Sequence, residues 1–365
     1  MHCWITKETL MKRTSWLIST AAVTALGLSA CGGDAPDTEA NGEAAAPAPE
    51  MQTWRVALEE IEGSVQHRYA ERFAELVEER TDDVEFVIYS YGELSPSFDE
   101  IYTQLQDGAV QFGFGSGFFG GVVPENDVFS LSFVLTDDEW TNTQILNDEA
   151  FLWSDPLQSA FRDRDVQILS LVPEGWQVWA GNVEIRSVED FEGVRIRVMD
   201  NRLLRQTYSA YGADPTSVSY ADIYGALETG SIDANIQPVF AHQEMSFYEV
   251  QDYMIFGRHK PFVAAWLANR DFWDNLSEEH RQVIREVNEE LVEYIHEVQV
   301  ELNDRRMDQI LEARPDVEII DIDEETREAF REASMPVRDT YVEMTGERGG
   351  QILDLLLETV EAHRD

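Results

Sequence analysis

Cysteine and lysine are the residue types that this 365-residue chain almost lacks. Both of its cysteines, Cys3 and Cys31, lie near the N-terminus. The remaining chain therefore has no thiol for a disulfide framework or for a nucleophilic Cys–His pair. Lys260 is the only lysine beyond residue 12, so arginine carries almost all of the positive charge.

Common catalytic and metal-binding patterns are also missing. The chain contains no Gly-x-Ser-x-Gly elbow, and its later histidines show no i, i+4 pair of the kind that holds zinc on a helix. These histidines are His67, His242, His259, His280, His296 and His363. The carboxylates are too numerous and scattered to single out an acid/base pair. The sequence thus predicts no metal and no cofactor, and an extracytoplasmic enzyme is the least favoured class.

Positive charge is scarce throughout. The chain has 27 Lys and Arg against 71 Asp and Glu, a formal net charge of −44 at pH 7. A field of this sign repels nucleic acid and anionic lipid, so neither is an expected partner. We interpret the composition as a halophilic surface, adapted to salt that screens repulsion within a few ångströms.

The N-terminus carries an apolar run too short to cross a bilayer. Residues 16–27 follow the basic pair Lys12-Arg13 and fall well below the roughly 20 residues of a spanning helix. Leu28-Ser29-Ala30-Cys31 then resembles a lipobox cleavage pattern. Residues 1–30 are therefore predicted to be a lipoprotein signal peptide, which leaves a lipidated Cys31. A plain secretory leader with a free Cys31 stays open, and Met11 is an alternative start.

Residues 31–52 are rich in Ala, Pro, Gly, Glu and Asp and show no apolar period, which is typical of a flexible tether. About 310 residues follow, too many for one typical core, so we expect two lobes. Strands over 55–59, 84–89 and 110–114 alternate with helices after Ser64 and over 98–106, and a further helical pattern runs from Trp140 to Phe161. This order predicts an α/β fold with ligands received at the carboxyl ends of strands.

One apolar stripe continues from Ser277 to about Leu311, which predicts a single helix about 50 Å long. A coiled coil is the alternative. Gly115-Ser116-Gly117-Phe118-Phe119-Gly120 has the letters of a dinucleotide loop, but Pro124 follows too soon for a helix to start. We instead predict a ligand-facing loop, in which Ser116 hydrogen-bonds to a solute and Phe118 or Phe119 packs on it. The alternative places both phenylalanines in the core.

The most informative stretch is Asp190–Pro238. Val194, Ile196 and Val198 alternate with two arginines, as in a half-buried strand. Arg197 at its end could offer two parallel donors to a carboxylate, although a solvated surface arginine fits the same pattern.

This stretch resembles the solute receptors of tripartite ATP-independent periplasmic (TRAP) transporters, the DctP family. Two segments carry the resemblance: Asp190-Phe-Glu-Gly-Val-Arg-Ile-Arg-Val and Asp222-Ile-Tyr-Gly-Ala-Leu-Glu-Thr-Gly-Ser-Ile-Asp-Ala-Asn-Ile-Gln-Pro. A weaker similarity extends over most of the chain from Trp54 onward. It implies a two-lobed, type II-like periplasmic-binding-protein fold with hinge strands and one long spine helix. Residues 53–173 and about 258–300 would form lobe I, 174–257 and about 301–345 lobe II, and 346–365 a C-terminal helix.

The resemblance also implies function. Such a receptor captures a small organic acid in the periplasm of a Gram-negative bacterium and delivers it to the TRAP permease subunits, which use an ion gradient. Arg197 would hold the carboxylate, and Tyr220 and the amide of Gln237 would line the pocket. Gln177 stands where many relatives have a second arginine, which favours one carboxylate over two. Asp200, just after Arg197, completes this part of the predicted site.

Four segments are most similar to the ectoine-receptor branch of the family: Trp54–Glu60, Pro173–Gly175, Asp200–Leu204 and Glu343–Glu347. Ectoines are zwitterions, and desolvated charges need a partner at each end. The resemblance implies that Glu59 meets the cationic ring and that aromatic rings enclose it. A surface role for Glu59 stays open. So does a sensory ligand-binding lipoprotein, which would use the same pocket.

Overall fold

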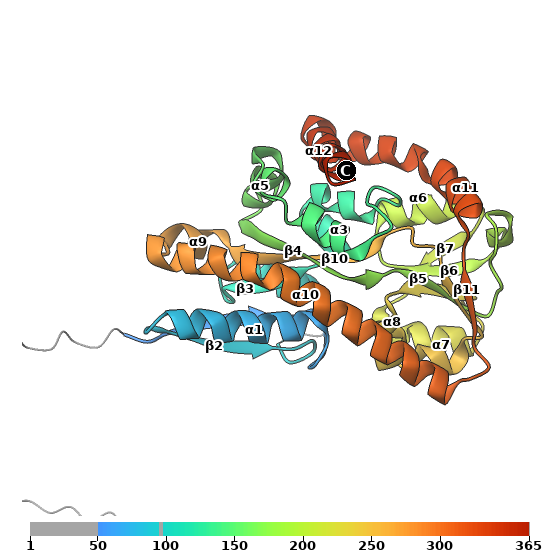
Figure 1. Ribbon diagram of the computed structural model, residues 1–365, viewed down its shortest axis with the longest axis horizontal. Coiled ribbons are helices and arrows are strands. Elements are labelled where there is room, and N and C mark those ends of the chain that lie inside the picture. The colour runs from blue at the N-terminus through green and yellow to red at the C-terminus, as the bar shows by residue number, and fades with distance from the viewer. Residues whose placement is uncertain (1–49, 95–97, 365) are drawn as a thin grey trace, which may run out of the picture. The chain divides into compact units, whose positions relative to one another are not determined.

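The computed structural model describes residues 50–94 and 98–364 (Figure 1). The chain divides into two units between Ala48 and Pro49, and the second unit contains everything described below. The predicted leader, Cys31 and most of the predicted tether lie outside the described residues.

Two separate β-sheets organise the described chain. The first has the strand order β2-β1-β3-β10-β4, in which β1 pairs in parallel with β2 and β3 while β10 is antiparallel to β3 and β4. Its strands are β1 (Gln52–Ala57), β2 (Val84–Tyr89), β3 (Phe112–Gly115), β4 (Val166–Trp176) and β10 (Pro261–Asn269). Helices α1 (Val65–Arg80) and α2 (Phe98–Gln106) connect the first three strands. This is the predicted βαβ arrangement of lobe I.

The second sheet has the order β11-β9-β5-β8-β6-β7. Its strands are β5 (Val178–Gly181), β6 (Arg195–Val198), β7 (Asp214–Ser217), β8 (Ala234–Gln237), β9 (Tyr253–Phe256) and β11 (Glu318–Asp321). Its helices are α6 (Arg202–Ala210), α7 (Ile223–Glu228), α8 (Val239–Glu244) and α11 (Glu324–Ser334). The chain passes between the sheets at Gln177 and again at residues 257–260. The two-lobed α/β fold is confirmed, whereas the exact lobe boundaries stay a prediction.

The predicted long helix is α10 (Glu278–Ala313), 36 residues without a break. Ser277 caps it, because its side chain accepts a 3.0 Å hydrogen bond from the His280 amide. The helix packs against α1 and β4 of the first lobe and against α8 of the second (Figure 1). One element therefore supports both lobes.

Three regions differ from the expected elements. The helical pattern over 140–161 is divided among α3 (Glu139–Leu146), α4 (Glu149–Leu152) and α5 (Asp155–Arg162), because Asp148 caps a new helix and Pro156 starts another. The chain after β3 forms two 3₁₀ helices, η1 (Gly117–Gly121) and η2 (Pro124–Ser130). The last helix, α12 (Pro336–Ala362), begins before residue 346 and is kinked at Gly346, whose φ is 68°.

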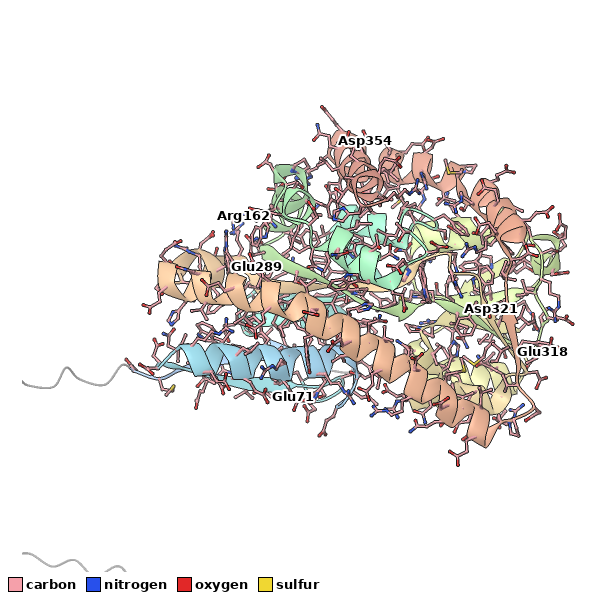
Figure 2. The ribbon with its side chains drawn as sticks, in the orientation of Figure 1. Glu71, Arg162, Glu289, Glu318, Asp321 and Asp354 are labelled. Carbon is pink, nitrogen blue, oxygen red and sulfur yellow. The ribbon has the colours of Figure 1, made fainter. Side chains whose placement is uncertain are left out.

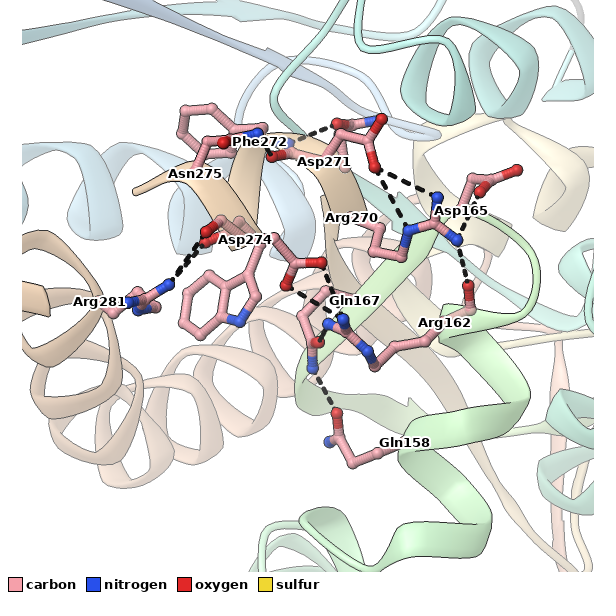
Figure 3. Close-up of polar contacts among 12 residues, drawn as sticks. Gln158, Arg162, Asp165, Gln167, Arg270, Asp271, Phe272, Asp274, Asn275 and Arg281 are labelled. Carbon is pink, nitrogen blue, oxygen red and sulfur yellow. Dashed lines mark hydrogen bonds and ion pairs between the residues drawn. The ribbon is translucent and has the colours of Figure 1, made fainter. Parts of the chain in front are cut away.

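Arginine forks connect elements that a lysine could join at only one point. Arg162 of α5 binds Asp274 of α9 (Arg270–Asn275) at 2.8 Å and Gln167 of β4 at 2.7 Å (Figure 3). Arg270 likewise binds Asp165 at 2.8 Å. Because a guanidinium group offers several donors in one plane, each arginine can hydrogen-bond to acceptors on more than one element at once.

Candidate functional site

A cavity that opens to solvent lies where the two lobes face each other. Its walls come from the carboxyl ends of β1 and β3 on one side and of β6 and β8 on the other. Six of the predicted site residues line it: Glu59, Ser116, Phe118, Arg197, Tyr220 and Gln237. Strand ends are the expected ligand position in α/β folds.

Arg197 is the unpaired cation of this cavity. It lies in β6, where Ile196 and Val198 fill the core, and its side chain is 1% exposed. Its Nε donates to the Val218 carbonyl at 3.0 Å, while its Nη1 has no hydrogen-bond partner and no described carboxylate forms an ion pair with Arg197. Burial lowers the Arg197 pKa to about 10. A buried guanidinium with an unused donor is complementary to a carboxylate.

Arg195 shows the opposite outcome on the same strand. Its side chain is exposed and binds Asp233, with Nε 2.9 Å from Oδ2. Asp233 is therefore paired with Arg195 within the protein. The pair provides an internal comparison for Arg197.

Glu59 is buried directly after β1, and most of its hydrogen-bonding capacity is used within the protein. Its Oε1 accepts from the amide and the hydroxyl of Ser116, both at 3.2 Å, and from the Tyr102 hydroxyl. Gln66 lies 3.4 Å from its other oxygen. Burial raises the pKa of Glu59 to about 7. Glu59 and Ser116 thus hold each other at the cavity wall.

Glu60 is the residue that sequence reasoning missed. It also lines the cavity; its Oε2 accepts a hydrogen bond from the backbone N–H of Gln66 at 3.0 Å, and its side chain also hydrogen-bonds to Glu174 and Ser64. Burial raises its pKa to about 7. It belongs to the same Trp54–Glu60 segment as Glu59, but alternation cannot tell the two apart beyond the end of the strand.

Further carboxylates make this side of the cavity acidic. Gln66 donates to Glu174 at 3.1 Å, and Glu244 lines the cavity while pairing with Arg306 at 2.8 Å. Burial raises the pKa of both carboxyl groups. The site therefore offers one free guanidinium facing several carboxylates, which is complementary to a ligand that carries both signs of charge.

Aromatic rings form another wall. Phe118 stacks on Phe98 with centroids 4.8 Å apart, and Tyr91 lies 5.3 Å from Phe98. Phe119, by contrast, is buried in the core against Tyr102. One phenylalanine therefore takes each expected position, Phe118 at the cavity and Phe119 in the core, because the turn of η1 directs their side chains apart.

Gln177 and Asp200 are not brought into the cavity lining. Gln177 is buried where the chain crosses between lobes; its backbone N–H donates to the Lys260 carbonyl at 3.1 Å, and its side-chain Oε1 has no hydrogen-bond partner. The Asp200 side chain is 78% exposed and pairs with Arg205 at 2.5 Å. The chain turns after β6, so Asp200 faces solvent although Arg197 faces inward. We therefore exclude Asp200 from the ligand-binding residues proposed below.

Within residues 50–94 and 98–364, no cluster of three His, Cys, Asp or Glu side chains is arranged to hold a metal ion. Over the same ranges, no helix combines the length and the apolar character needed to span a bilayer.

Two lobes that enclose a charged cavity define an extracytoplasmic solute-binding protein. Residues 57–344 match the family model of bacterial extracellular solute-binding proteins, family 7 (DctP), and the chain belongs to this family. It is a TRAP transporter solute-binding protein.

Two relatives share 34% identity with this chain. The ectoine/5-hydroxyectoine-binding periplasmic protein UehA of Ruegeria pomeroyi aligns over 313 residues, 85% of this chain and 91% of the relative. The ectoine-binding periplasmic protein TeaA of Halomonas elongata aligns over 302 residues, 82% and 88% of the two chains. The high-resolution structure of the periplasmic ectoine-binding protein from the TeaABC TRAP transporter of H. elongata superimposes with a TM-score of 0.80 at 32% identity, covering 85% of this chain and 100% of that one.

Proposed function

We propose that this protein captures an ectoine-like zwitterion in the periplasm and delivers it to a TRAP permease. The observation that carries the proposal is the unpartnered Nη1 of buried Arg197 in a cavity whose other charged lining residues are Glu59, Glu60 and Glu244. The solute carboxylate would bind Arg197, and Glu60 and Glu59 would balance its cationic ring. The similarity to two ectoine-binding relatives supports the same ligand class.

Capture would work by lobe closure. Arg197 and Gln237 lie in the second lobe, whereas Glu60, Ser116 and Phe118 lie in the first. A solute that contacts both sides favours the closed form by its differential affinity for that form. The permease would then recognise the closed receptor. Gln177, buried and without a charge, offers no second anchor, so we propose a ligand with a single carboxylate.

We further propose that the protein binds its solute unchanged and is held at the membrane by a lipid on Cys31. Incorporation of labelled palmitate that is lost in Cys31→Ser would support the anchor. Recovery of chemically intact ectoine after incubation with the protein would support binding without turnover. Permease genes beside this gene would favour transport over the sensory alternative.

The decisive experiment compares two arginines of one strand. Isothermal titration with ectoine should show that Arg197→Ala weakens binding by at least tenfold, since a buried hydrogen bond to a charged group contributes about 1.5–3 kcal/mol. Arg195→Ala removes an exposed arginine two residues away and should leave the affinity unchanged. Equal affinity in the wild type and Arg197→Ala would contradict the proposed anchor, and no ectoine binding by the wild type would contradict the proposed ligand.

A further inference from the structure

A buried polar contact joins the two lobes next to the cavity. Asn201 lies at the start of α6 in the second lobe, and its Nδ2 donates to Asp127 Oδ1 at 2.7 Å. The same atom lies 3.2 Å from Ser130 Oγ and 3.3 Å from the Gly117 carbonyl. Asp127, Ser130 and Gly117 all belong to the 3₁₀ helices that follow β3 of the first lobe. One amide group therefore spans the junction between the lobes.

Helix capping does not account for this contact. Asn201 caps α6 with its other atom, because Oδ1 accepts from the Leu204 amide at 3.1 Å. Serine or aspartate would serve the cap equally well. The Nδ2 donor is thus free for the first lobe, and asparagine is the side chain that performs both tasks at once.

Asp127 is a buried carboxylate whose removal from water destabilises the folded protein. It is 4% exposed and forms no ion pair with the described residues, although Lys260 at the lobe crossing attracts it electrostatically. Burial raises its pKa to about 7. Room for it depends on Gly120, because a Cβ there would lie 1.9 Å from Asp127 Oδ1. A buried carboxyl group of this kind destabilises the fold unless its hydrogen bonds compensate.

The contact adjoins the solute site without being part of it. Met199, two residues before Asn201, lines the cavity and packs on Gly117. Ser116 and Phe118, on either side of Gly117, line the cavity from the first lobe. Asp127 and Asn201 themselves are not among the lining residues. Their hydrogen bond joins the two cavity walls at a point outside the cavity lining.

We propose that Asp127 and Asn201 form an interlobe clasp that holds the two lobes in the arrangement of this structure, both before and after a solute binds. The two residues are positioning residues, and the proposal rests on the solute-binding function argued above. Breaking the clasp should allow the lobes to reopen sooner, so the solute dissociates about tenfold faster while its association rate changes little.

The test exchanges the two side chains. Asn201→Asp keeps the acceptor that caps α6 but places two carboxyl groups in contact, and Asp127→Asn removes the charged acceptor. The double variant Asp127→Asn/Asn201→Asp restores one donor and one acceptor in the reverse order. We expect stopped-flow measurements to give faster ectoine dissociation in both single variants and recovery in the double variant. Asp138→Asn is the matched control, because it makes the same change at a cap of α3, whose Thr141 contact needs only an oxygen acceptor.

A second measurement does not depend on the solute. Without ectoine, amide hydrogen exchange across residues 117–130 should quicken in each single variant and slow again in the double variant. Dissociation rates and exchange that match the wild type in the single variants, or a double variant no better than either, would overturn the clasp. A wild type that fails to bind ectoine would instead contradict the proposed ligand, and exchange would still decide whether the clasp exists.

Discussion

Glu59 and Glu60 are neighbours in sequence, yet the structure gives them different environments. Glu59 accepts hydrogen bonds from Ser116 and Tyr102, so its carboxyl group is committed to the cavity wall. Glu60 also hydrogen-bonds to Glu174, Ser64 and the Gln66 backbone, but it is less buried than Glu59 and therefore more accessible to a ligand. We therefore expect the cationic end of the solute to depend more on Glu60, and Glu59→Gln to act mainly through stability.

Solute affinity should rise with pH because the carboxyl group of Glu60 must ionise to attract a cation. Its pKa in the folded protein is about 7, raised from 4.5 mainly by burial and also by the negative charge of Glu244, while a hydrogen bond with Glu174 opposes the rise. A raised acid pKa means that the folded state holds more protons, so this group's contribution lowers the stability of the free protein as pH rises from 4.5 through about 7. Binding of a cationic ring opposes that trend.

Titrations with ectoine at about pH 5 and about pH 8 should thus give the tighter binding at the higher value. Glu60→Gln should bind more weakly at the higher pH and lose most of the dependence. Four other charged residues face this part of the cavity or lie near it: Glu59, Glu174, Glu244 and Arg197. Arg197→Ala removes the carboxylate anchor but keeps Glu60, so its affinity should be lower at every pH and should rise with pH by the same factor. A slope unchanged in Glu60→Gln would assign the titration to another group.

Site residues were predictable from the sequence where a local pattern places them, and not where a turn or a long-range contact does. Arg197 follows from strand alternation, and Phe118 and Ser116 from a loop at a strand end. Asp200 lies only three residues after Arg197, but a turn whose direction leaves no pattern in the sequence points it to solvent. Long-range contacts, such as the one between Asn201 and Asp127, leave no local pattern at all.

The strand crossing from β4 to β5 depends on one glycine. Gly175 has φ 112°, and a Cβ there would lie 2.4 Å from Asn303 of α10. Asn303 itself donates to the Glu174 carbonyl at 2.9 Å and accepts from the Phe240 amide at 3.0 Å. The long helix thus holds the crossing strand and α8 through one side chain.

Gly175→Ala should therefore destabilise the protein by about 2 kcal/mol or more, because backbone strain adds to the clash with Asn303. Gly193→Ala is the control: φ is 70° there, but nothing lies within 4 Å of the added methyl group. Urea unfolding would measure both, and equal losses would show that the Asn303 contact adds nothing.

Element types were more predictable than element ends. The long apolar stripe and the Ser277 cap gave α10 within a few residues, because many positions report the same period. The division of residues 139–162 into three helices was missed. A capping aspartate and a proline outweighed a continuous helical pattern there.

At the scale of the molecule, acidic side chains project over much of the described surface, among them Glu71, Glu318 and Asp321 (Figure 2). Exposed ion pairs contribute little each, so they offset only part of the repulsion that a net charge of −44 creates. The melting temperature should rise between about 0.1 M and about 1 M KCl, where the Debye length falls from about 10 to about 3 Å. A melting temperature indifferent to salt would contradict the halophilic interpretation.

Lys260 is the only lysine of the chain beyond residue 12, and it is 5% exposed at the crossing between the lobes. An endoprotease that cleaves on the amino side of lysine avoids the Lys260–Pro261 bond and meets a single target in the described chain, one that becomes accessible only when the crossing opens. Native protein should resist digestion there, and unfolded protein should give two large fragments divided at the His259–Lys260 bond. The ratio of intact to cut chain would then report the unfolded fraction on a gel, without any engineered label.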